Sequence, residues 1–404
     1  MPLTDKTAEH PIDYRTAPIL PSFAMADSEP TPTPAPTPDA SLEERLAPLR
    51  QRIDELDQQI VNLLNERAGV VIEVGHVKRD TDGPIYAPER EKRVLERVRS
   101  HNHQHPESKR LPDACLDAIY RELMSGSFAL ERPLRIGYLG PAGSFSHAAA
   151  TAKFGASVEY DNLADIGMIF DAVSRKHIDY GLVPIENSTE GSVNATLDGL
   201  LKSDVSVCAE VLIAIHHNLM ANCDAPQINA IHSHPQALAQ CRNWLNAQFP
   251  KVERVACSST SRAVQLAAET PNAAAIGSTL AGRLFSVNTQ FEAIEDNPNN
   301  TTRFFILGRQ KPAPSGDDKT TLFFTTKHQP GALTAVLDVF RDAKINLTHI
   351  DKRPSQSTNW EYTFFVDLIG HRDDPALQSA LDAARAHCQS IKVLGSFPRA
   401  QQTI

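Results

Sequence analysis

A helical repeat between residues 49 and 78 limits most strongly what the first part of this chain can fold into. Apolar residues recur there in alternating steps of four and three, the period of a helix that packs along one face. They are Leu49, Ile53, Leu56, Ile60, Leu63, Val70 and Val74. The member missing from the series is Arg67, and Lys78 continues the stripe one turn beyond it. The segment therefore predicts a long helix with two cations in its apolar face.

These two cations indicate a ligand. Arg67 and Lys78 are eleven residues apart, which returns them to nearly one face, on the order of 16 Å apart along the helix. A single long cationic side chain commonly extends out of an apolar seam into water. Two in one stripe are harder to place in this way, because an unpaired buried charge is costly. An anionic ligand would offset that cost.

The helix and the segments that follow it carry a wider pattern. LRQRIDELDQQIVNLLNERAGVVIEVGHVK and then PEREKRVLERV, within residues 41–132, resemble the helical chorismate mutase family. The resemblance implies an all-α domain whose cations hold the two carboxylates of chorismate while it rearranges to prephenate. Such a site needs no metal or nucleophile, because it preorganises a reactive conformer and stabilises charge on the breaking ether oxygen. The matching positions are Arg50, Arg67, Lys78, Arg90, Glu91, Ser127 and Glu131.

Arg50 points to an oligomer. It lies seventeen residues before Arg67, hence about 100° away around the helix, and cannot readily serve the same pocket from its own chain. In the chorismate mutase family, the arginine at the position of Arg50 comes from the partner of an intertwined dimer. The resemblance and the geometry together imply a homodimer or a higher homo-oligomer.

Two positions depart from the family pattern. Ala87 stands where the family often has an aspartate, which removes a contact to a substrate hydroxyl. Glu131 stands where some members have glutamine, and it must be protonated to donate to the ether oxygen, which favours acidic pH. A chain whose mutase is impaired by Ala87 is therefore an open alternative.

Polar clusters follow the strands of the next region, residues 133–311, which alternates strand and helix patterns as an α/β domain does. Any one cluster is explained by caps and turns, but five of them favour a ligand at the strand ends of an open sheet. They are GPAGSFSHAAA, VPIENSTEGSV, IHSHPQALAQC, SSTSRA and AAIGS, and a further polar run, NNTTRFF, enters a strand at the end of the region.

VPIENS, SHPQAL and TTRF, in this order, resemble prephenate dehydratase across the whole region. The resemblance implies two subdomains with a substrate cleft between them, as in periplasmic binding proteins. Prephenate loses carbon dioxide and its ring hydroxyl there and becomes phenylpyruvate. Thr302 matches the family's essential threonine and is the candidate donor to the departing hydroxyl. The resemblance also carries over four cleft residues: Glu186, Asn187, Ser233 and Gln240.

Arg303 has two interpretations. Neighbours in a strand face opposite ways, so Thr302 and Arg303 should not both point into one cleft. Arg303 is therefore a candidate either for substrate binding or for holding the subdomains together.

The last unit, residues 319–399, reads strand, helix, strand, strand, helix, strand, the order of a ferredoxin-like βαββαβ domain. It resembles the ACT domain, which binds amino acids between subunits. The resemblance places a bound carboxylate at the helix that starts in Gly331, Ala332 and Leu333. Asp351, Arg353 and Pro354 align with a second family motif in which Lys352 replaces a small hydroxyl residue. Phenylalanine is the implied allosteric ligand.

Composition excludes several other classes. A net charge of −9 argues against nucleic acid, and no run approaches the apolar length of a membrane helix. Six scattered cysteines without a CxxC pair indicate a reduced cytoplasm, without a disulfide framework or a zinc site. His101, His103 and His105 lack further ligands in metal spacing, so no metal or other cofactor is expected. Residues 1–40 are Pro/Thr-rich and predict disorder.

The sequence thus favours a bifunctional enzyme of phenylalanine biosynthesis with a regulatory domain at its end. The alternative from another class is a non-catalytic amino-acid sensor built from the second and third units. Thr302 and the intact VPIENS segment argue against that alternative.

Overall fold

The structure is a computed structural model that describes residues 41–80, 84–104, 109–354 and 362–403. The Pro/Thr-rich extension, 1–40, lies outside the described residues. The chain divides into two units, residues 1–64 and 65–404. Within the described residues no helix is long and apolar enough to cross a membrane.

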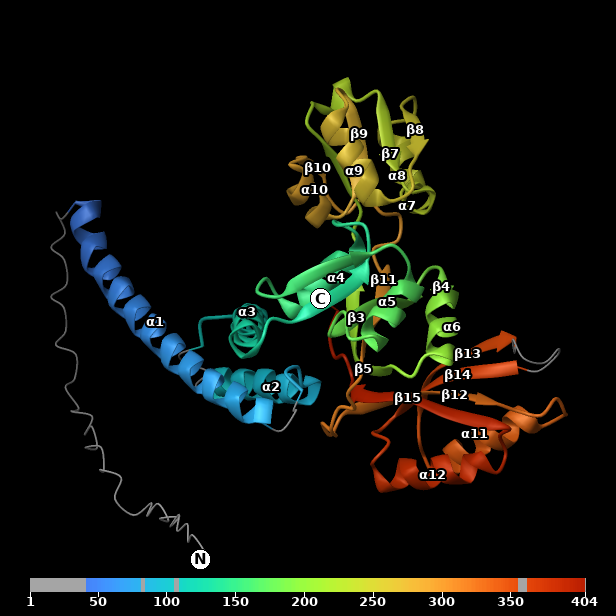
Figure 1. Ribbon diagram of the computed structural model, residues 1–404. Coiled ribbons are helices and arrows are strands. Elements are labelled where there is room, and N and C mark those ends of the chain that lie inside the picture. The colour runs from blue at the N-terminus through green and yellow to red at the C-terminus, as the bar shows by residue number, and fades with distance from the viewer. Residues whose placement is uncertain (1–40, 81–83, 105–108, 355–361, 404) are drawn as a thin grey trace, which may run out of the picture. The chain divides into compact units, whose positions relative to one another are not determined.

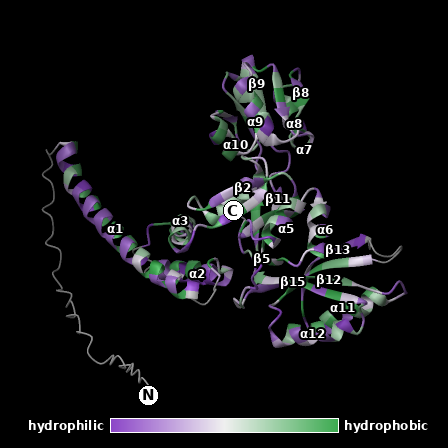
Figure 2. Cartoon of the chain, viewed as in Figure 1, coloured by the Kyte–Doolittle hydropathy of each residue, from purple (hydrophilic) through white to green (hydrophobic). Residues whose placement is uncertain are grey.

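The described part of residues 41–132 is mainly helical, as predicted. The helices are α1 (Leu42–Asp80), α2 (Pro88–Gln104) and α3 (Asp113–Glu131). Figure 2 shows hydrophilic and hydrophobic residues interleaved along α1. The apolar stripe is exposed in the single chain, with Leu49 62% and Leu63 64% accessible. An ion pair joins α2 to α3, because both Arg99 nitrogens Nε and Nη2 bind the Asp117 carboxylate, at 3.0 and 2.7 Å.

The next region contains two sheets (Figure 1). The first has the order β2-β1-β3-β11-β5, with β4 paired to β3. Its final strand, β11, returns from far along the chain and runs antiparallel to both β3 and β5. The elements of this sheet are β1 (Arg135–Leu139), α4 (Phe145–Phe154), β2 (Glu159–Leu163), α5 (Ile166–Ser174), β3 (Tyr180–Asn187), β4 (Gly191–Ser192), α6 (Asn194–Lys202), β5 (Ser206–Ala214) and β11 (Thr301–Gly308).

The second sheet has the order β10-β6-β9-β7-β8. Its elements are β6 (Asn218–Ala221), a 3₁₀ turn (Ala225–Gln227), β7 (Ala230–Ser233), α7 (Pro235–Gln240), α8 (Arg242–Gln248), β8 (Glu253–Ala256), α9 (Thr260–Glu269), β9 (Ala273–Gly277), α10 (Thr279–Phe285) and β10 (Thr289–Phe291). The chain enters this sheet after β5 and leaves it before β11. Backbone hydrogen bonds tie the two crossings together, from Ile215 N to Asn300 O and from Ile294 N to His217 O, both at 2.8 Å. The predicted pair of α/β subdomains is confirmed.

The last sheet has the order β13-β14-β12-β15. Its elements follow the predicted βαββαβ order: β12 (Asp318–Thr325), α11 (Ala332–Asp342), β13 (Leu347–Pro354), β14 (Tyr362–Ile369), α12 (Pro375–Arg385) and β15 (Ser390–Pro398). Both helices carry one apolar face, which packs on the sheet through residues such as Val336, Phe340, Leu377 and Leu381.

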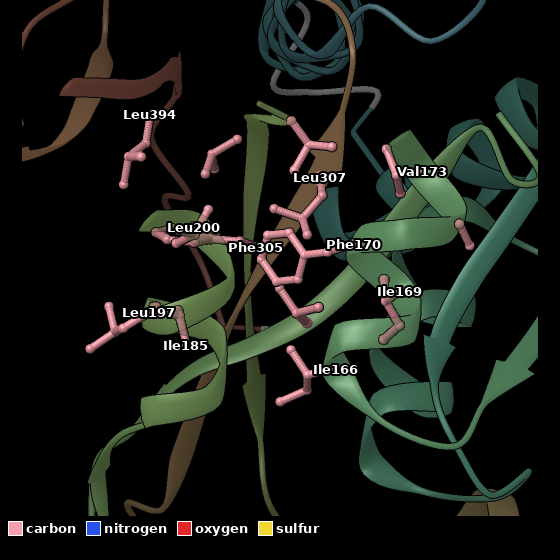
Figure 3. Packing of buried hydrophobic residues seen from close by; sticks show 14 of the residues in the cluster. Ile166, Ile169, Phe170, Val173, Ile185, Leu197, Leu200, Phe305, Leu307 and Leu394 are labelled. Carbon is pink, nitrogen blue, oxygen red and sulfur yellow. The ribbon is translucent and has the colours of Figure 1, made fainter. Parts of the chain in front are cut away.

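This last sheet shares a hydrophobic core with the first. Phe305 of β11 lies 6.4 Å from Phe365 of β14 and 5.7 Å from Phe397 of β15, measured between ring centroids. Figure 3 shows Phe305 and Leu307 among side chains of α5 and α6, and Leu394 of β15 belongs to the same cluster. Because buried aromatic area is a large stabilising term, this core binds the two sheets as one body.

Gly395 permits the close approach of the two sheets. A Cβ atom added there would lie 2.0 Å from the carbonyl oxygen of Val207 on β5. We therefore expect Gly395→Ala to destabilise the chain by roughly 1–3 kcal/mol, since the clash is with backbone that cannot turn aside. The measurement is the thermal unfolding midpoint of the full chain.

Gly126→Ala is the matched control, because an added Cβ there has nothing within 4 Å. In the interior of α3 this change should leave stability unchanged or raise it slightly. Equal midpoints for the two variants would show that β15 does not pack against β5 as described.

Candidate active sites

A cleft of about 500 Å³ lies between the first and second sheets. Its lining includes Thr302 and Asn187 of the first sheet and Gln240 at the end of α7, beside the second sheet. All three are predicted site residues. The lining also includes the start of α4 and the start of α9, where Ser144 and Ser259 cap the helices. Four of the five predicted polar clusters thus meet at one place, whereas AAIGS, residues 274–278, is absent from the lining.

The direction of the hydrogen bond between Asn187 and Thr302 is determined by the backbone. The Asn187 Oδ1 accepts from the backbone N–H groups of Thr189 and Glu190, at 2.9 and 3.1 Å. Its amide nitrogen must therefore be the group that donates to Thr302 Oγ1, at 2.8 Å. Since that bond occupies a lone pair of the hydroxyl oxygen, the Thr302 hydrogen remains available to a ligand.

Hydrogen bonds also fix the amide orientations of Asn300 and Gln240. Asn187 Nδ2 also donates to Asn300 Oδ1 at 2.9 Å, so the Asn300 amide nitrogen faces Gln240 Oε1, at 3.4 Å. The Gln240 oxygen then accepts from His217 Nε2 at 2.8 Å, which fixes the proton of this imidazole on Nε2. The Gln240 amide nitrogen is left to donate to a ligand.

His217 and Asn300 are site residues that the sequence did not reveal. Asn300 belongs to the NNTT run that enters β11. The preceding Asn297 stabilises the turn, because its Oδ1 accepts from Asn299 N at 3.0 Å. His217 is 2% accessible, and burial lowers the pKa of its imidazole, so it stays neutral at physiological pH. Its one sequence signal is its position directly after β5, where the chain crosses between sheets.

Glu295 connects the two segments of chain that pass between the first and second sheets. Its carboxylate accepts from His217 N at 2.8 Å and contacts His216 Nδ1 at 2.7 Å. Burial opposes the charged form of this carboxyl, but these two hydrogen bonds outweigh burial and lower its pKa. Glu295 therefore joins the two connections at the base of the cleft.

Three predicted cleft residues lie elsewhere. Ser233 is fully buried and donates to the carbonyl oxygen of Ile276, so it joins β7 to β9. Glu186 and Arg303 are neighbours of Asn187 and Thr302, and the strand pleat turns them to the opposite face of the sheet. The prediction that Thr302 and Arg303 point in opposite directions is confirmed, and a direct role for Arg303 in the cleft is corrected.

Arg303 is the centre of a buried ion cluster. Its Nε lies 2.8 Å from Glu210 Oε2 of β5, and its Nη1 lies 2.5 Å from Asp367 Oδ2 of β14. Its guanidinium also lies over the Phe305 ring, 4.8 Å from the centroid. Burial alone would lower the pKa of Arg303, but the charges of Asp367 and Glu210 raise it above its ordinary value. Arg303 thus joins the first sheet to the last sheet, whereas the sequence had suggested a link between subdomains.

The predicted mutase residues form two contacts between α1 and α3. Arg67 donates to Ser127 Oγ at 2.9 Å, and Lys78 Nζ lies 2.9 Å from Glu131 Oε2. Gly75 allows the helices to approach, since a Cβ there would lie 3.2 Å from Glu131 Cγ. The two cations of the apolar stripe therefore both face α3, and Glu131 is bound to a cation in the free chain.

Other predicted mutase residues are placed differently. Arg50 pairs with Glu43 of its own helix, and Arg90 is exposed at the start of α2. The Glu91 carboxylate binds Lys153 of α4 at 2.7 Å and accepts from the Tyr86 hydroxyl at 3.1 Å. Glu91 therefore contacts a partly buried side chain of the following region, and its predicted role in the mutase site stays a prediction.

The predicted regulatory residues lie on α11 and β13. Gly331 precedes α11 in the left-handed region, with φ 79°, which other residues adopt only with strain, and Ala332 and Leu333 begin the helix. Asp351 Oδ1 accepts from Lys352 N at 2.7 Å, and Pro354 ends β13. Arg353 Nη2 binds Asp198 of α6 at 2.5 Å, so this motif contacts the first sheet's helices.

Comparison with known proteins assigns each region. Residues 49–132 match the family chorismate mutase type II, residues 136–312 match prephenate dehydratase, and residues 320–386 match the ACT domain. A bifunctional chorismate mutase/prephenate dehydratase of Stutzerimonas stutzeri is 42% identical over 364 residues, which cover 88% of this chain and 98% of that protein.

Two solved structures share the fold of the second and third regions. Prephenate dehydratase from Arthrobacter aurescens in complex with L-Phe is 32% identical, with a TM-score of 0.62, over 67% of this chain and 92% of that one. A protein described as a novel type of quorum quenching acylase is 25% identical, also with a TM-score of 0.62, over 66% of this chain and 98% of that one. The order of the three matched regions, together with the near full-length relative, shows that this chain belongs to the bifunctional chorismate mutase/prephenate dehydratase family.

Proposed function

We propose that this chain converts chorismate to prephenate at α1–α3 and converts prephenate to phenylpyruvate in the cleft between its two sheets. The observation that carries the second reaction is the Thr302 hydroxyl, whose hydrogen is left free by the bond from Asn187. The free cysteines of the chain fit an enzyme of the reduced cytoplasm.

In the cleft, the C–C bond to the ring carboxylate breaks as carbon dioxide leaves, and its electron pair enters the ring. Aromatisation then expels the ring hydroxyl from the opposite position. Thr302 donates a hydrogen bond to the departing oxygen and stabilises the charge that develops there. A threonine hydroxyl is too weak an acid to transfer its proton unaided, so its contribution is position and polarisation. Gln240 donates to a substrate carboxylate through its free amide nitrogen.

In the mutase site, Arg67 and Lys78 attract the carboxylates of chorismate. Both already contact polar side chains of α3 in the free chain. On binding, each cation would replace that contact with a contact to a substrate carboxylate. Glu131 must take up a proton and leave Lys78 before it donates to the ether oxygen. Ala87 has no polar side-chain atom and contributes no hydrogen bond to the substrate.

The exposed stripe of α1 supports a homodimer. Leu49, Ile53, Leu56, Ile60 and Leu63 present a continuous apolar face that a second copy of α1 would bury. The same pairing would deliver Arg50 to the partner's site. We further propose that phenylalanine binds at the Gly331 turn of α11 and regulates the dehydratase, as the L-Phe complex of the Arthrobacter aurescens relative suggests.

The dehydratase role of Thr302 is tested by two substitutions. Thr302→Ala should lower kcat for prephenate by about two or more orders of magnitude, as for a donor that acts mainly in the transition state. Thr302→Ser should keep part of the rate, because it retains the hydroxyl but loses the restraint that β-branching places on χ1. Steady-state assays of phenylpyruvate formation measure both.

KM should change little in either variant, and mutase activity serves as the internal control. A raised KM with kcat preserved would make Thr302 a residue that binds the ground state. Equal loss in Ser and Ala would show that the methyl group matters and the hydroxyl does not. A wild-type chain without prephenate turnover would favour a non-catalytic sensor.

The mutase and its dimer are tested together by complementation. Arg67→Ala should abolish chorismate rearrangement and leave dehydratase activity on supplied prephenate within a few-fold, because Arg67 contacts α3 and lies outside the cleft lining. Arg50→Ala should also be inactive as a mutase. Co-expression of the two variants should restore about a quarter of the wild-type rate, since half of randomly paired dimers hold one intact site.

The recovery distinguishes a shared site from a site built within one chain. No restoration, with dimers present by light scattering, would mean that Arg50 does not act across the dimer. Loss of dehydratase activity in Arg67→Ala would mean that the two units do not function separately.

A further inference from the structure

Two adjacent residues of β11 point to opposite faces of the sheet. Thr302 faces the cleft, whereas Arg303 is 7% accessible and faces the last sheet, where it binds Glu210 and Asp367. One peptide unit therefore joins the candidate donor to a side chain that the last sheet holds. Any rotation of this peptide that turns Thr302 must also pull Arg303 from its buried partners.

Each of those partners is fixed independently of Arg303. Asp367 is fully buried on β14, and its other oxygen accepts from Thr321 Oγ1 of β12 at 2.6 Å. Glu210 binds Lys319 Nζ at 3.1 Å and accepts from Ala400 N at 2.9 Å. Arg303 thus binds two carboxylates whose orientation is already fixed by other hydrogen bonds and ion pairs. A buried ion pair can often be replaced by apolar residues with little loss of stability, so its presence here fits a directional role.

The backbone next to Arg303 is irregular. Arg303 pairs with Glu186 of β3, but the next residue, Phe304, pairs with Pro184, so the register shifts between Arg303 and Phe304. Such a bulge disrupts the ladder locally and changes the direction of nearby side chains. The ladder with β5 stays in regular register through Thr302 and Arg303, so the irregularity is confined to the β3 side. The Arg303 side chain adds a restraint next to this irregularity.

We propose that Asp367, a residue of the ACT sheet, is a positioning residue for the dehydratase reaction and acts on Thr302 through Arg303. The proposal rests on the proposed role of Thr302 as the donor. It makes the ACT sheet a supporting part of the active site as well as the candidate sensor. It also gives the sheet a route to the reaction, because any shift of β14 changes the anchor of the peptide that carries Thr302.

The test compares Asp367→Asn with the wild-type full chain. The amide keeps the size of the side chain but removes the charge that orients Arg303. We expect kcat for prephenate to fall on the order of ten- to a hundredfold, as for a displaced reacting group, while KM stays within about threefold. Arg303→Lys should give the same pattern, because a lysine cannot bind two carboxylates in the fork geometry of arginine. It serves as the second variant if Asp367→Asn does not fold.

Lys392→Met is the matched control. Lys392 also joins the ACT sheet to the dehydratase region, through the carbonyl oxygens of Leu200 and Ser203 at 3.2 and 2.6 Å, but it is remote in sequence and register from Thr302. This variant should lower the unfolding midpoint with kcat unchanged. A fall in kcat equal to that of Asp367→Asn would show that loss of docking alone causes the defect, and the proposal would be wrong.

A double-mutant cycle with Thr302→Ala separates positioning from a direct effect. If Asp367 acts through Thr302, Asp367→Asn should lower the residual rate of Thr302→Ala less than twofold, because the hydroxyl to be positioned is already gone. The same factor in both backgrounds, or wild-type kcat in the single variant, overturns the proposal. A wild-type rate of zero, or full activity in Thr302→Ala, would instead refute the proposed function.

Discussion

The direction of the hydrogen bond from the Asn187 amide to the Thr302 hydroxyl governs what the dehydratase cleft can do. Two backbone N–H groups hold the Asn187 oxygen, so its nitrogen can only donate. The Thr302 hydrogen is therefore free to donate to a ligand, as the proposed stabilisation of a departing hydroxyl requires. The amides of Asn300 and Gln240 follow in order, and the network ends at the buried, neutral His217.

Strand β11 connects this network to the rest of the molecule. It lies between β3 and β5, places Thr302 on the cleft side and Arg303 on the other, and continues into the core shared with the last sheet through Phe305. A domain that is regulatory by resemblance is thus bound to the catalytic strand by both apolar packing and buried charge.

Much of this arrangement follows from local sequence patterns. The stripe that contains Arg67 and Lys78 predicted the long helix and the common face of its two cations, and pleat alternation predicted that Thr302 and Arg303 point to opposite sides of the sheet. The strand and helix order of all three regions was equally readable, because their periodicity is strong. Glu186 and Ser233 were expected in the cleft but do not line it, and the partner of Glu91 was not foreseen, since a motif gives the residue but not the partner that tertiary packing presents. Lys153 meets Glu91 across 62 residues of chain, and Asp367 meets Arg303 across 64. Nothing local encodes such pairings.

Thr302 is free to donate to a ligand because the Asn187 oxygen is turned towards two backbone N–H groups and only the Asn187 amide nitrogen faces the hydroxyl. Asn187→Asp tests this directly: the new carboxylate still accepts from the Thr189 and Glu190 N–H groups, so the turn is preserved, but it also accepts the Thr302 hydrogen. The measurement is kcat for prephenate at neutral pH in the full chain. The account predicts a loss of about two orders of magnitude, similar to removal of a transition-state donor, with the mutase rate unchanged. A variant that turns over prephenate at the wild-type rate would contradict it.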